Sequence, residues 1–561
     1  MKEKIRSACS LDCWDACALL VTKENGRAIK IKGDPAHEIT QGFICEKGRK
    51  HLDRVYHSQR ILYPLQRKGK DWQKISWAQA IKLMAEKLQE IKKDYGSTAV
   101  VHYYDCGSGG ILKEIDQLFF NLYGGVSKHV GSLCWAPGIA AQKYDFGLPL
   151  SHHPEDLANS KVILIWGRNP LETNIHLVTF LKKARAKGAK LVTIDPIKTP
   201  TALMSDLYFQ PRPGTDGALA LGIARILLEE GLQDSDFLEN HSLGFREYAE
   251  MVQEYTLEKT AAITGIPEIE ILQLAKLYGE NKPGCIIIGY GLQRYTNSGQ
   301  AVRAIDALAA LTGNIGIAGG GANYANFSAS LHYDFSHLEG EKKQENYRYY
   351  PKSQLAQFLK TADSPPVKAM FVLRSNPVVQ VPDTNQLIKA LEQVDFKVVI
   401  DLFMTDTAKM ADLILPCTSF LEEENLISTS MGHGYINYAN QVIEPLGEAK
   451  TEYEIFQLLA KEMGMTKFPQ DKVEDLLKKV LQPITEKYGI SLEMLKEKSY
   501  SLPEFHQIPW ADKKFLTPSG KYEFLSQGAG GEAGNPLPIF RETAESLVGK
   551  EYNANQFYFL T

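Results

Sequence analysis

The stretches VILIWGRNP (162–170) and LVTIDPIKTPTALMSDLYFQP (191–211) say most about the architecture of this chain. Each begins with a short apolar run bounded by turn residues, which is typical of a strand buried in a parallel sheet. The first run is followed by Asn-Pro, with Asn169, and the second ends in Ile-Asp, with Asp195. The pattern therefore predicts two parallel strands, each followed at its carboxyl end by a polar residue.

A second pair of stretches repeats this pattern. MFVLRSNPV (370–378) carries Asn376 before a proline, and VVIDLFMTDTAKMADLILP (398–416) has a run that ends at Asp401. Both second stretches continue with T-A-x-M-x-D-L, and the next aspartate follows at an equal distance, from Asp195 to Asp206 and from Asp401 to Asp412. The match predicts an internal structural repeat.

Two similar halves predict two similar binding crevices, because open α/β sheets bind nucleotides at the carboxyl ends of their strands. An aspartate that closes a second strand can accept hydrogen bonds from a ribose or from a guanine edge. The alternative is that strand–turn–helix segments look alike because they share turn chemistry. Turn chemistry explains the Asn-Pro pairs, but chance is a poor explanation for matching Asp, Thr, Met and Asp in one order. We therefore expect two dinucleotide-like sites.

Four cysteines near the N-terminus have the spacing C-x3-C-x3-C-x27-C: Cys9, Cys13, Cys17 and Cys45. Three thiolates on one tight loop, closed by a distant fourth, suit a [4Fe–4S] cluster. A structural zinc site is the alternative, although zinc sites more often show two-residue spacing and symmetric pairs. Unrelated free thiols are a weaker interpretation, because half of the 8 cysteines fall in the first 45 residues. We expect a cluster, and with it electron transfer.

Bulk properties narrow the class of protein. The 561-residue chain is too long for one hydrophobic core, so we expect several domains. Its net charge of −4 arises from 63 basic and 67 acidic residues that are well mixed, which argues against nucleic-acid binding and against a polybasic membrane patch. No apolar run could span a bilayer. The N-terminal MKEKIRSACS lacks an export signal, so we expect a cytoplasmic protein with reduced thiols.

In combination, these features resemble the molybdopterin-dinucleotide oxidoreductases of the dimethyl-sulfoxide-reductase superfamily, and among them the prokaryotic, formate-dehydrogenase-like members. The resemblance extends from Cys9 to about Leu525. It is carried by the cysteine set, by Glu46-Lys47-Gly48 after it, and by five further segments: GRNP (167–170), PGTDGALALG (213–222), RAIDALAALTGNIGIAGGG (303–321), ADLILPCTSFLEEE (411–424) and TPSGKYEF (517–524). Only the combination is specific.

The resemblance and the strand pattern together imply an α/β multidomain fold, with two related Rossmann-like parallel-sheet domains and a small N-terminal iron–sulfur domain. The expected boundaries are an iron–sulfur domain at 1–60 joined by parts of 425–535, a first dinucleotide-binding domain at 61–110 with 325–424, a second at 111–324, and the start of a truncated C-terminal domain at 536–561.

The resemblance also implies the cofactors. In that family a bis(molybdopterin guanine dinucleotide) holds molybdenum or tungsten, and the protein commonly supplies a further ligand. The matching segment GSLCWAPGIAA implies Cys134 as that ligand, and a thiolate is a soft donor suited to such a metal. The alternative for a lone cysteine is a small buried hydrophobe. Lys47 resembles the family lysine whose ammonium lies between cluster and pterin, and a solvated lysine in the basic stretch EKGRKH is its alternative.

Further residues fall where the family contacts its two dinucleotides: Gly167, Asn169, Asp195, Gly214, Asp216, Gln293, Asn376, Asp401 and Thr405. Structural turn roles are the alternative for Gly214 and Asn376. The remaining cysteines, Cys106, Cys285 and Cys417, lie in or beside strand-like runs, and we expect them to be packing residues.

Two positions depart from the family pattern. Ile197 stands where members often have an arginine, so a phosphate or guanine contact is altered. Trp135 stands where formate dehydrogenases have a histidine after the metal ligand, and indole cannot accept a proton. Formate is therefore expected to be a poor substrate unless another group replaces the histidine as base; the candidates are His102, Asp105 and His129.

The expected function is that of a molybdenum- or tungsten-dependent oxidoreductase that passes electrons between a small-molecule substrate and an electron-transfer partner protein. One alternative is a non-redox tungsten hydratase of the same superfamily, and another is an inactive or electron-transfer subunit. Family members usually continue with a C-terminal barrel domain, and EYNANQFYFLT (551–561) resembles its linker and first strand. We expect either a separate chain that supplies the remainder or a sequence that is part of a longer one.

Overall fold

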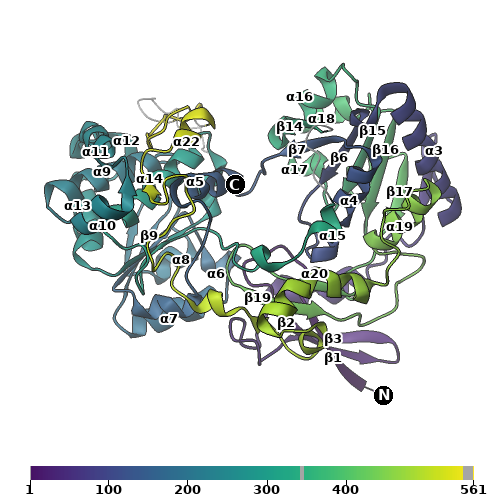
Figure 1. The fold of residues 1–561 in the computed structure, drawn as a ribbon, viewed down its shortest axis with the longest axis horizontal. Coiled ribbons are helices and arrows are strands. Elements are labelled where there is room, and N and C mark those ends of the chain that lie inside the picture. The colour runs from purple at the N-terminus through teal and green to yellow at the C-terminus, as the bar shows by residue number, and fades with distance from the viewer. Residues whose placement is uncertain (1, 341–346, 533, 547–559, 561) are drawn as a thin grey trace. The chain divides into compact units, whose positions relative to one another are not determined.

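The computed structural model describes residues 2–340, 347–532, 534–546 and 560. The chain forms two compact units, each of them α/β with a central sheet of parallel strands, as predicted (Figure 1). Unit 1 comprises Met1–Leu133, Ala329–Thr429 and Tyr435–Ser501, and unit 2 comprises Cys134–Ser328, Ser430–Gly434 and Leu502–Thr561. Within the described residues, no helix is both long enough and apolar enough to cross a membrane.

The centre of unit 1 is an eight-stranded sheet in the order β14-β7-β6-β15-β16-β17-β4-β5. The strands from β14 to β17 are parallel, and β4 and β5 close one edge as an antiparallel hairpin. The strands are β4 (Leu65–Lys68), β5 (Asp71–Lys74), β6 (Val100–Tyr104), β7 (Ser127–Val130), β14 (Arg348–Pro351), β15 (Ala369–Leu373), β16 (Phe396–Asp401) and β17 (Leu413–Pro416).

Successive side chains of each strand point to opposite faces of this sheet. Apolar side chains therefore lie on both faces, and helices cover both. Val101 and Val372 face a core that includes α16 (Leu355–Thr361) and α18 (Thr384–Leu391). On the other face, Phe371 of β15 packs edge-on against Phe120 of α4 (Ile115–Tyr123), 5.6 Å between ring centroids. Figure 1 shows α3 (Trp77–Tyr95) and α19 (Glu452–Glu462) across the sheet from α16 and α18.

The centre of unit 2 is a five-stranded sheet in the order β10-β9-β8-β12-β13, with every pair parallel. One core joins this sheet to its helices. The elements are β8 (Val162–Trp166), β9 (Lys190–Ile194), β10 (Leu207–Phe209), β12 (Gly284–Ile288), β13 (Ala322–Asn323), α5 (Ala136–Phe146), α9 (Asp216–Glu229) and α14 (Ser298–Leu311).

The N-terminal segment of unit 1 is an antiparallel sheet of three strands, followed by two short helices. These elements are β1 (Lys2–Ala8), β2 (Ala18–Glu24), β3 (Arg27–Gly33), α1 (Glu46–Arg49) and α2 (His51–Val55). Leu19 and Val21 on its inner face pack with Phe420 and Leu421. Residues from the ADLILPCTSFLEEE segment therefore complete the core of the N-terminal region.

The two units divide the chain at Leu133, whereas the predicted domain boundary lies at residue 110. The difference arises because β7 is paired on both sides within the unit 1 sheet. Of the predicted C-terminal start at 536–561, residues 547–559 and 561 lie outside the described residues. The part before them packs on unit 2, where Asn297 Nδ2 donates to the Arg541 carbonyl at 2.7 Å.

Candidate functional site

Each central sheet has one point at which the strand order reverses. In unit 2 the chain-order strands β8, β9, β10, β12 and β13 lie as 3-2-1-4-5, so the reversal falls between β8 and β12. In unit 1 the strands β6, β7, β14, β15, β16 and β17 lie as 3-2-1-4-5-6, with the reversal between β6 and β15. Open α/β sheets bind ligands in the crevice at such a switch point, outside the carboxyl ends of the strands.

The predicted internal repeat is present in the structure, beginning in both units at a strand beside the switch point. Asn169 follows β8 and Asn376 follows β15, with nearly equal backbone angles of φ −121° and −126°. Each Asn Oδ1 accepts from a threonine hydroxyl, from Thr201 at 2.6 Å and from Thr407 at 2.7 Å.

The second aspartates of the repeat are also equivalent. Asp206 Oδ2 accepts from the backbone N–H of Leu191 at 2.9 Å, and Asp412 Oδ2 accepts from that of Lys397 at 2.7 Å. Both carboxylates therefore tie the next strand of the sheet to the previous one. This shared bonding explains why the two aspartates keep the same spacing in sequence.

Asp195 and Asp401 occupy matching places at the carboxyl ends of β9 and β16. Asp195 Oδ1 accepts from the Ile197 N–H at 3.0 Å, and Asp401 Oδ1 accepts from the Leu402 N–H at 2.6 Å. Burial raises the pKa of both carboxyl groups. Within the described part of the chain, only Oδ1 of each is hydrogen-bonded, so Oδ2 of each is free to accept from a ligand.

The switch points share a further feature, a close approach of two backbones. Gly289 lies against Gly167, so that a Cβ at Gly289 would come within 2.0 Å of the Gly167 carbonyl oxygen. In unit 1, Gly107 lies in the same way against Arg374, where a Cβ would come within 2.4 Å of the carbonyl oxygen. Glycine is therefore required on one side of each crevice.

A cavity of about 180 Å³ opens at the unit 1 switch point. Its lining includes the predicted residues Asn376 and Asp401, together with Ser108 from the loop after β6. Thr405 lies just beyond, and its hydroxyl accepts from the Ala408 N–H at 3.2 Å. Polar groups thus line a space where a nucleotide could bind.

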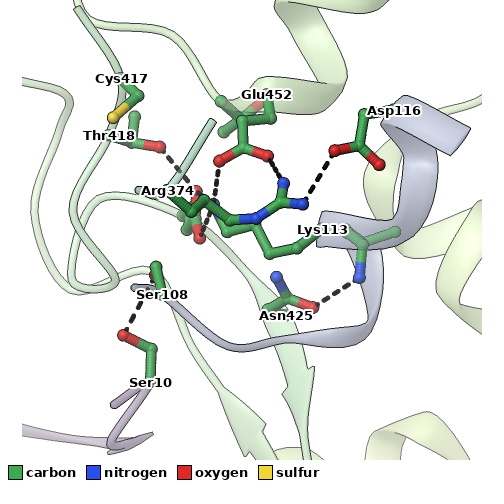
Figure 2. A network of polar contacts seen from close by, with 12 residues as sticks. Ser10, Ser108, Lys113, Asp116, Arg374, Cys417, Thr418, Asn425 and Glu452 are labelled. Carbon is green, nitrogen blue, oxygen red and sulfur yellow. Dashed lines mark hydrogen bonds and ion pairs between the residues drawn. The ribbon is translucent and has the colours of Figure 1, made fainter. Parts of the chain in front are cut away.

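Arg374 lines this cavity, and Figure 2 shows it at the centre of a network of polar contacts. Its guanidinium is buried between Asp116, at 2.8 Å, and Glu452. Lys113 joins the network through Glu452 at 3.8 Å and also pairs with Glu423 at 2.8 Å. Although burial alone raises the pKa of Asp116, Arg374 and His102 lower it to about 2. The network therefore consists of paired, ionised groups.

In unit 2, Cys134 stands directly before Trp135, the residue that caps α5, and its side chain is exposed. The Gly138 N–H of α5 donates to Gln293 Oε1 at 3.0 Å. Gln293 Nε2 is buried and has no hydrogen-bond partner among the described residues. Tyr324 donates from its hydroxyl to the Trp135 carbonyl at 2.8 Å. An exposed thiol and an unpaired amide N–H therefore lie at the same helix end.

Two other predicted residues of unit 2 have structural partners. Gly214 has a positive φ of 77°, and Asn297 donates to its carbonyl at 2.9 Å. Asp216 is 4% exposed and accepts from Trp166 Nε1 at 2.8 Å. Burial raises the pKa of Asp216 to about 6. Asp216 thus supports the end of β8, and Gly214 is tied to the start of α14.

The four N-terminal cysteines are placed by the ends of three elements. Cys9 follows β1 and Cys17 precedes β2, joined by a hydrogen bond from the Cys9 N–H to the Cys17 carbonyl at 2.8 Å. Cys45 caps α1 and accepts from the Gly48 N–H at 3.4 Å. Cys13 lies on the loop between Cys9 and Cys17 and is half-buried.

The electrostatics of these thiols fit an iron–sulfur cluster. Burial, followed by the charges of neighbouring groups, raises the pKa of Cys9 to about 11, and it raises that of Cys13 to about 12. Burial and the charge of Asp15 raise the pKa of Cys17, and the other three cysteines add to this effect. Several adjacent buried thiolates require compensating positive charge, which iron would supply.

In the part of the chain that the structure describes, no group of three or more His, Cys, Asp or Glu side chains is already placed to hold a metal ion. The zinc alternative is therefore separated from the cluster by the family match reported below and by metal analysis.

The candidate proton acceptors differ in their access. His102 is buried and paired with Asp116 at 3.1 Å. His129 donates from Nε2 to the Tyr104 carbonyl at 3.0 Å, and burial lowers its pKa to about 4. Asp105 pairs with Lys352 at 2.8 Å and is 32% exposed. Asp105 is thus the most accessible of the three, but its charge is already paired with that of Lys352.

Lys47 is exposed on α1, and it forms no ion pair among the described residues. Its predicted place between cluster and pterin stays a prediction. The other cysteines differ from one another: Cys285 is buried, Cys417 lines the unit 1 cavity, and Cys106 is exposed. The expectation that Cys106 packs was wrong, because it lies beyond the end of β6.

This fold, the cysteine set and the paired crevices define a molybdopterin enzyme with an iron–sulfur domain. Residues 60–462 match the molybdopterin oxidoreductase family, and residues 2–57 match the molybdopterin oxidoreductase Fe4S4 domain. The chain belongs to this family. It is therefore an oxidoreductase with a molybdenum or tungsten molybdopterin cofactor and a [4Fe–4S] cluster.

Individual relatives support this assignment. The probable oxidoreductase YyaE of Bacillus subtilis is 40% identical over 94% of this chain and 79% of its own length. The alpha subunit of an F420-dependent formate dehydrogenase from Methanocaldococcus jannaschii is 28% identical over 98% and 83% of the two lengths. Among solved structures, acetylene hydratase from Pelobacter acetylenicus aligns with a TM-score of 0.79 and 27% identity, over 96% of this chain and 80% of that one.

Proposed function

We propose that the chain binds its metal through bis(molybdopterin guanine dinucleotide), with one dinucleotide in the crevice of each unit. The observation that carries the proposal is the structural repeat, which sets the same Asn and Asp groups at the carboxyl ends of equivalent strands. Asp195 and Asp401 each keep one carboxylate oxygen free to accept from a guanine or a ribose. Gly167, Asn169, Asn376 and Thr405 shape the crevice walls around these two acids.

In this proposal, Cys134 is the sulfur ligand of the metal and the free Nε2 of Gln293 donates to the bound pterin. When bound, the metal–pterin group supplies the redox chemistry. Lys47 places a positive charge between the pterin and the cluster. Asp216 holds the end of β8 and Gly214 is tied to the start of α14, so that the crevice of unit 2 keeps its shape. Cys9, Cys13, Cys17 and Cys45 would hold the cluster, which would supply a one-electron relay towards a partner protein.

We also propose that formate is a poor substrate. Trp135 follows Cys134, and its indole has only an N–H donor, so it cannot take the proton that formate oxidation releases. His102, the nearest histidine to the unit 1 network, is buried and paired. A small substrate that exchanges an oxygen atom at the metal makes less demand on a nearby base.

A second candidate is a tungsten hydratase that activates water without an external electron acceptor. The likeness to acetylene hydratase favours it, at 27% identity over nearly the whole chain. Dye-linked redox assays and hydration assays on the same preparation separate the two. Turnover that needs no acceptor dye would support the hydratase.

The test of the cofactor proposal is analysis of the protein purified without oxygen. We expect molybdenum or tungsten, two guanine nucleotides for each metal after hydrolysis, and about four irons, as one [4Fe–4S] cluster contains. Asp195→Ala and Asp401→Ala should each lower the guanine content, whereas Asp206→Ala, outside the crevice, should keep it. A preparation that binds metal but releases a pterin without guanine would contradict the proposal.

The ligand assignments have their own readouts. Cys13→Ser should abolish or alter the paramagnetic signal of the reduced cluster, with the molybdenum or tungsten content retained. Cys134→Ala should remove one sulfur from the metal in X-ray absorption. An unchanged metal spectrum in Cys134→Ala would refute the ligand assignment. A protein without any metal or pterin would instead indicate an inactive subunit.

A further inference from the structure

The antiparallel sheet β1-β2-β3 presents an outer face that is almost entirely basic. Its strand register sets three cross-strand rows on that face: Lys2–Glu24–Arg27, Lys4–Thr22–Lys30 and Arg6–Leu20–Lys32. These rows contain six cations and one acid. The arrangement follows from the alternation of side chains along each strand, because a residue and its second neighbour share a face.

The opposite face of the same sheet covers the cluster cysteines. Leu19, Val21 and Ala28 point to that side and share one core with Cys9 and Cys17. Since Cys9 directly follows β1 and Cys17 directly precedes β2, the basic face is one sheet layer away from the cluster.

The basic side chains in the middle of this face are not neutralised. Lys4, Lys30 and Lys32 are exposed, and none of them has an ion pair within the described residues. Only the rim is balanced, where Lys2 lies 3.7 Å from Glu24 and Arg6 lies 2.9 Å from Asp34. Unpaired like charges on one face repel one another and cost stability, which points to a partner that compensates them.

The charge is local to this part of the chain. Residues 2–57 contain eleven Lys and Arg against eight Asp and Glu, whereas the rest of the chain contains 52 against 59. An acidic partner is therefore attracted to the N-terminal region and repelled elsewhere. An exposed apolar side chain, Ile29, stands at the bulge between the rows, and a bound partner would remove it from water.

We propose that the outer face of β1-β2-β3 is the docking surface for a small acidic electron-carrier protein. This inference rests on the proposed function, in which the cluster is the exit or entry point for electrons. The occupant is an acidic protein because its carboxylates would pair with Lys4, Lys30 and Lys32. A carrier bound there is separated from the cluster by the sheet alone.

The test uses the anaerobically purified holoprotein and a reduced acidic [2Fe–2S] ferredoxin as the probe. The variant is Lys30→Glu with Lys32→Glu, and the control is Lys70→Glu with Lys93→Glu. Both control lysines are exposed, unpaired among the described residues and outside the N-terminal sheet, and the change in charge is the same. Stopped-flow oxidation of the ferredoxin is followed at about 0.02 M and at about 0.3 M salt, where screening is weak and strong respectively.

We expect the wild-type rate at low salt to fall by about tenfold or more in the Lys30/Lys32 variant, and to change by less than about twofold in the control. The difference should shrink at high salt, and a basic cytochrome c should show the opposite preference. Equal rates in variant and wild type would overturn the inference. Loss of binding to phosphatidylserine vesicles with an unchanged ferredoxin rate would overturn it in favour of a membrane surface.

Failure of the proposed function is distinguishable in the same preparations. Iron content and reduction of the cluster by dithionite are measured first, and they should be equal in wild type, variant and control. A wild-type protein without a reducible cluster would overturn both proposals. A cluster that dithionite reduces normally, with no dependence on Lys30 and Lys32, would overturn only the docking surface.

Discussion

The two halves of the repeat share their backbone but differ in charge at one position. Gly167 in unit 2 and Arg374 in unit 1 both adopt the left-handed conformation, with φ +60° and +54°. A non-glycine residue in this conformation costs of order 1 kcal/mol. In unit 1 the ion pairs of the guanidinium with Asp116 and Glu452 offset that cost. The repeat therefore keeps the left-handed backbone at this position. A side chain such as that of Arg374 is tolerated where its ion pairs offset the cost of that conformation.

The buried acids of the two units also differ. In unit 1, Arg374 and His102 outweigh the effect of burial and lower the pKa of Asp116 to about 2. In unit 2, burial raises the pKa of Asp216 to about 6, and burial next to Asp145 raises that of Asp306. The acid beside Arg374 in unit 1 thus has a lowered pKa, whereas these two buried acids of unit 2, which form no such ion pair among the described residues, have raised pKa values.

The largest effect is expected from breaking the charged network of unit 1. Arg374→Ala leaves Asp116 and Glu452 buried without their counter-charge, and the expected loss is about 3–5 kcal/mol. Hydrogen exchange of the β15 amides measures it. The triple variant Arg374→Gly, Asp116→Asn, Glu452→Gln should recover most of the loss, since it restores the glycine of the repeat and removes the charges. A loss below about 1 kcal/mol in Arg374→Ala would show that the network is not what distinguishes this half.

The next prediction is an opposite response to pH of two buried carboxyl groups, Asp216 in unit 2 and Asp116 in unit 1. The raised pKa of Asp216 means that its contribution is present below pH about 4 and is lost as pH rises through about 6, by about 3 kcal/mol. The lowered pKa of Asp116 means that its contribution is present above pH about 4 and is lost as pH falls towards about 2, by a similar amount.

Hydrogen exchange of each unit, corrected for intrinsic rates, checks both directions. Asp216→Asn should remove only the part of the dependence of unit 2 between pH about 4 and about 6 that Asp216 contributes, and Asp116→Asn should remove the corresponding part of unit 1 in acid. Each variant is compared with the wild type, and a difference of the same sign for both variants would contradict the assignment.

The repeat itself could be predicted from sequence because its marks are local. Asn169, Asp195 and their counterparts stand at fixed distances from apolar runs, so strand pattern and spacing were enough. The close pairs Gly107–Arg374 and Gly289–Gly167 could not be predicted in this way, since they depend on which strands are neighbours at the switch point. Only a prediction of the strand order would have indicated these close pairs.

The charged network was missed for a related reason. Asp116, Arg374 and Glu452 lie on three elements far apart in sequence, and none has a spacing that marks it. The misplaced Cys106 shows the limit of boundary prediction, because its apolar run ends at Tyr104, two residues before it. The basic face of β1-β2-β3 also needs the register of three strands.

A smaller effect is expected when both halves lose the same bond. Asp206→Ala and Asp412→Ala each remove a carboxylate that accepts from a strand N–H, and each should cost about 2 kcal/mol. The losses should agree within about 0.5 kcal/mol, because each site loses one strand N–H bond and one ion pair. The ion pairs are those of Asp206 with Arg185 and of Asp412 with Lys397. Local hydrogen exchange at Leu191 and Lys397 measures them. A large difference between the two losses would show that the two halves share a shape but are not stabilised to the same extent by this bond.

The smallest effect concerns the threonines that hold the two asparagines. Thr201 donates to Asn169 Oδ1 and accepts from the Leu171 N–H at 3.3 Å. Thr407 donates to Asn376 Oδ1 and accepts from the Val378 N–H at 3.1 Å.

Thr201→Val and Thr407→Val keep the shape of these buried side chains but remove both bonds, so each should cost about 1 kcal/mol, as measured by local hydrogen exchange. Because each threonine orients the asparagine of one crevice, each variant should also weaken retention of guanine nucleotide at one crevice only. The bound guanine should then fall equally in both variants, and further in the double variant. A loss confined to Thr407→Val would show that only the crevice of unit 1 holds a dinucleotide, and that the repeat in unit 2 is structural.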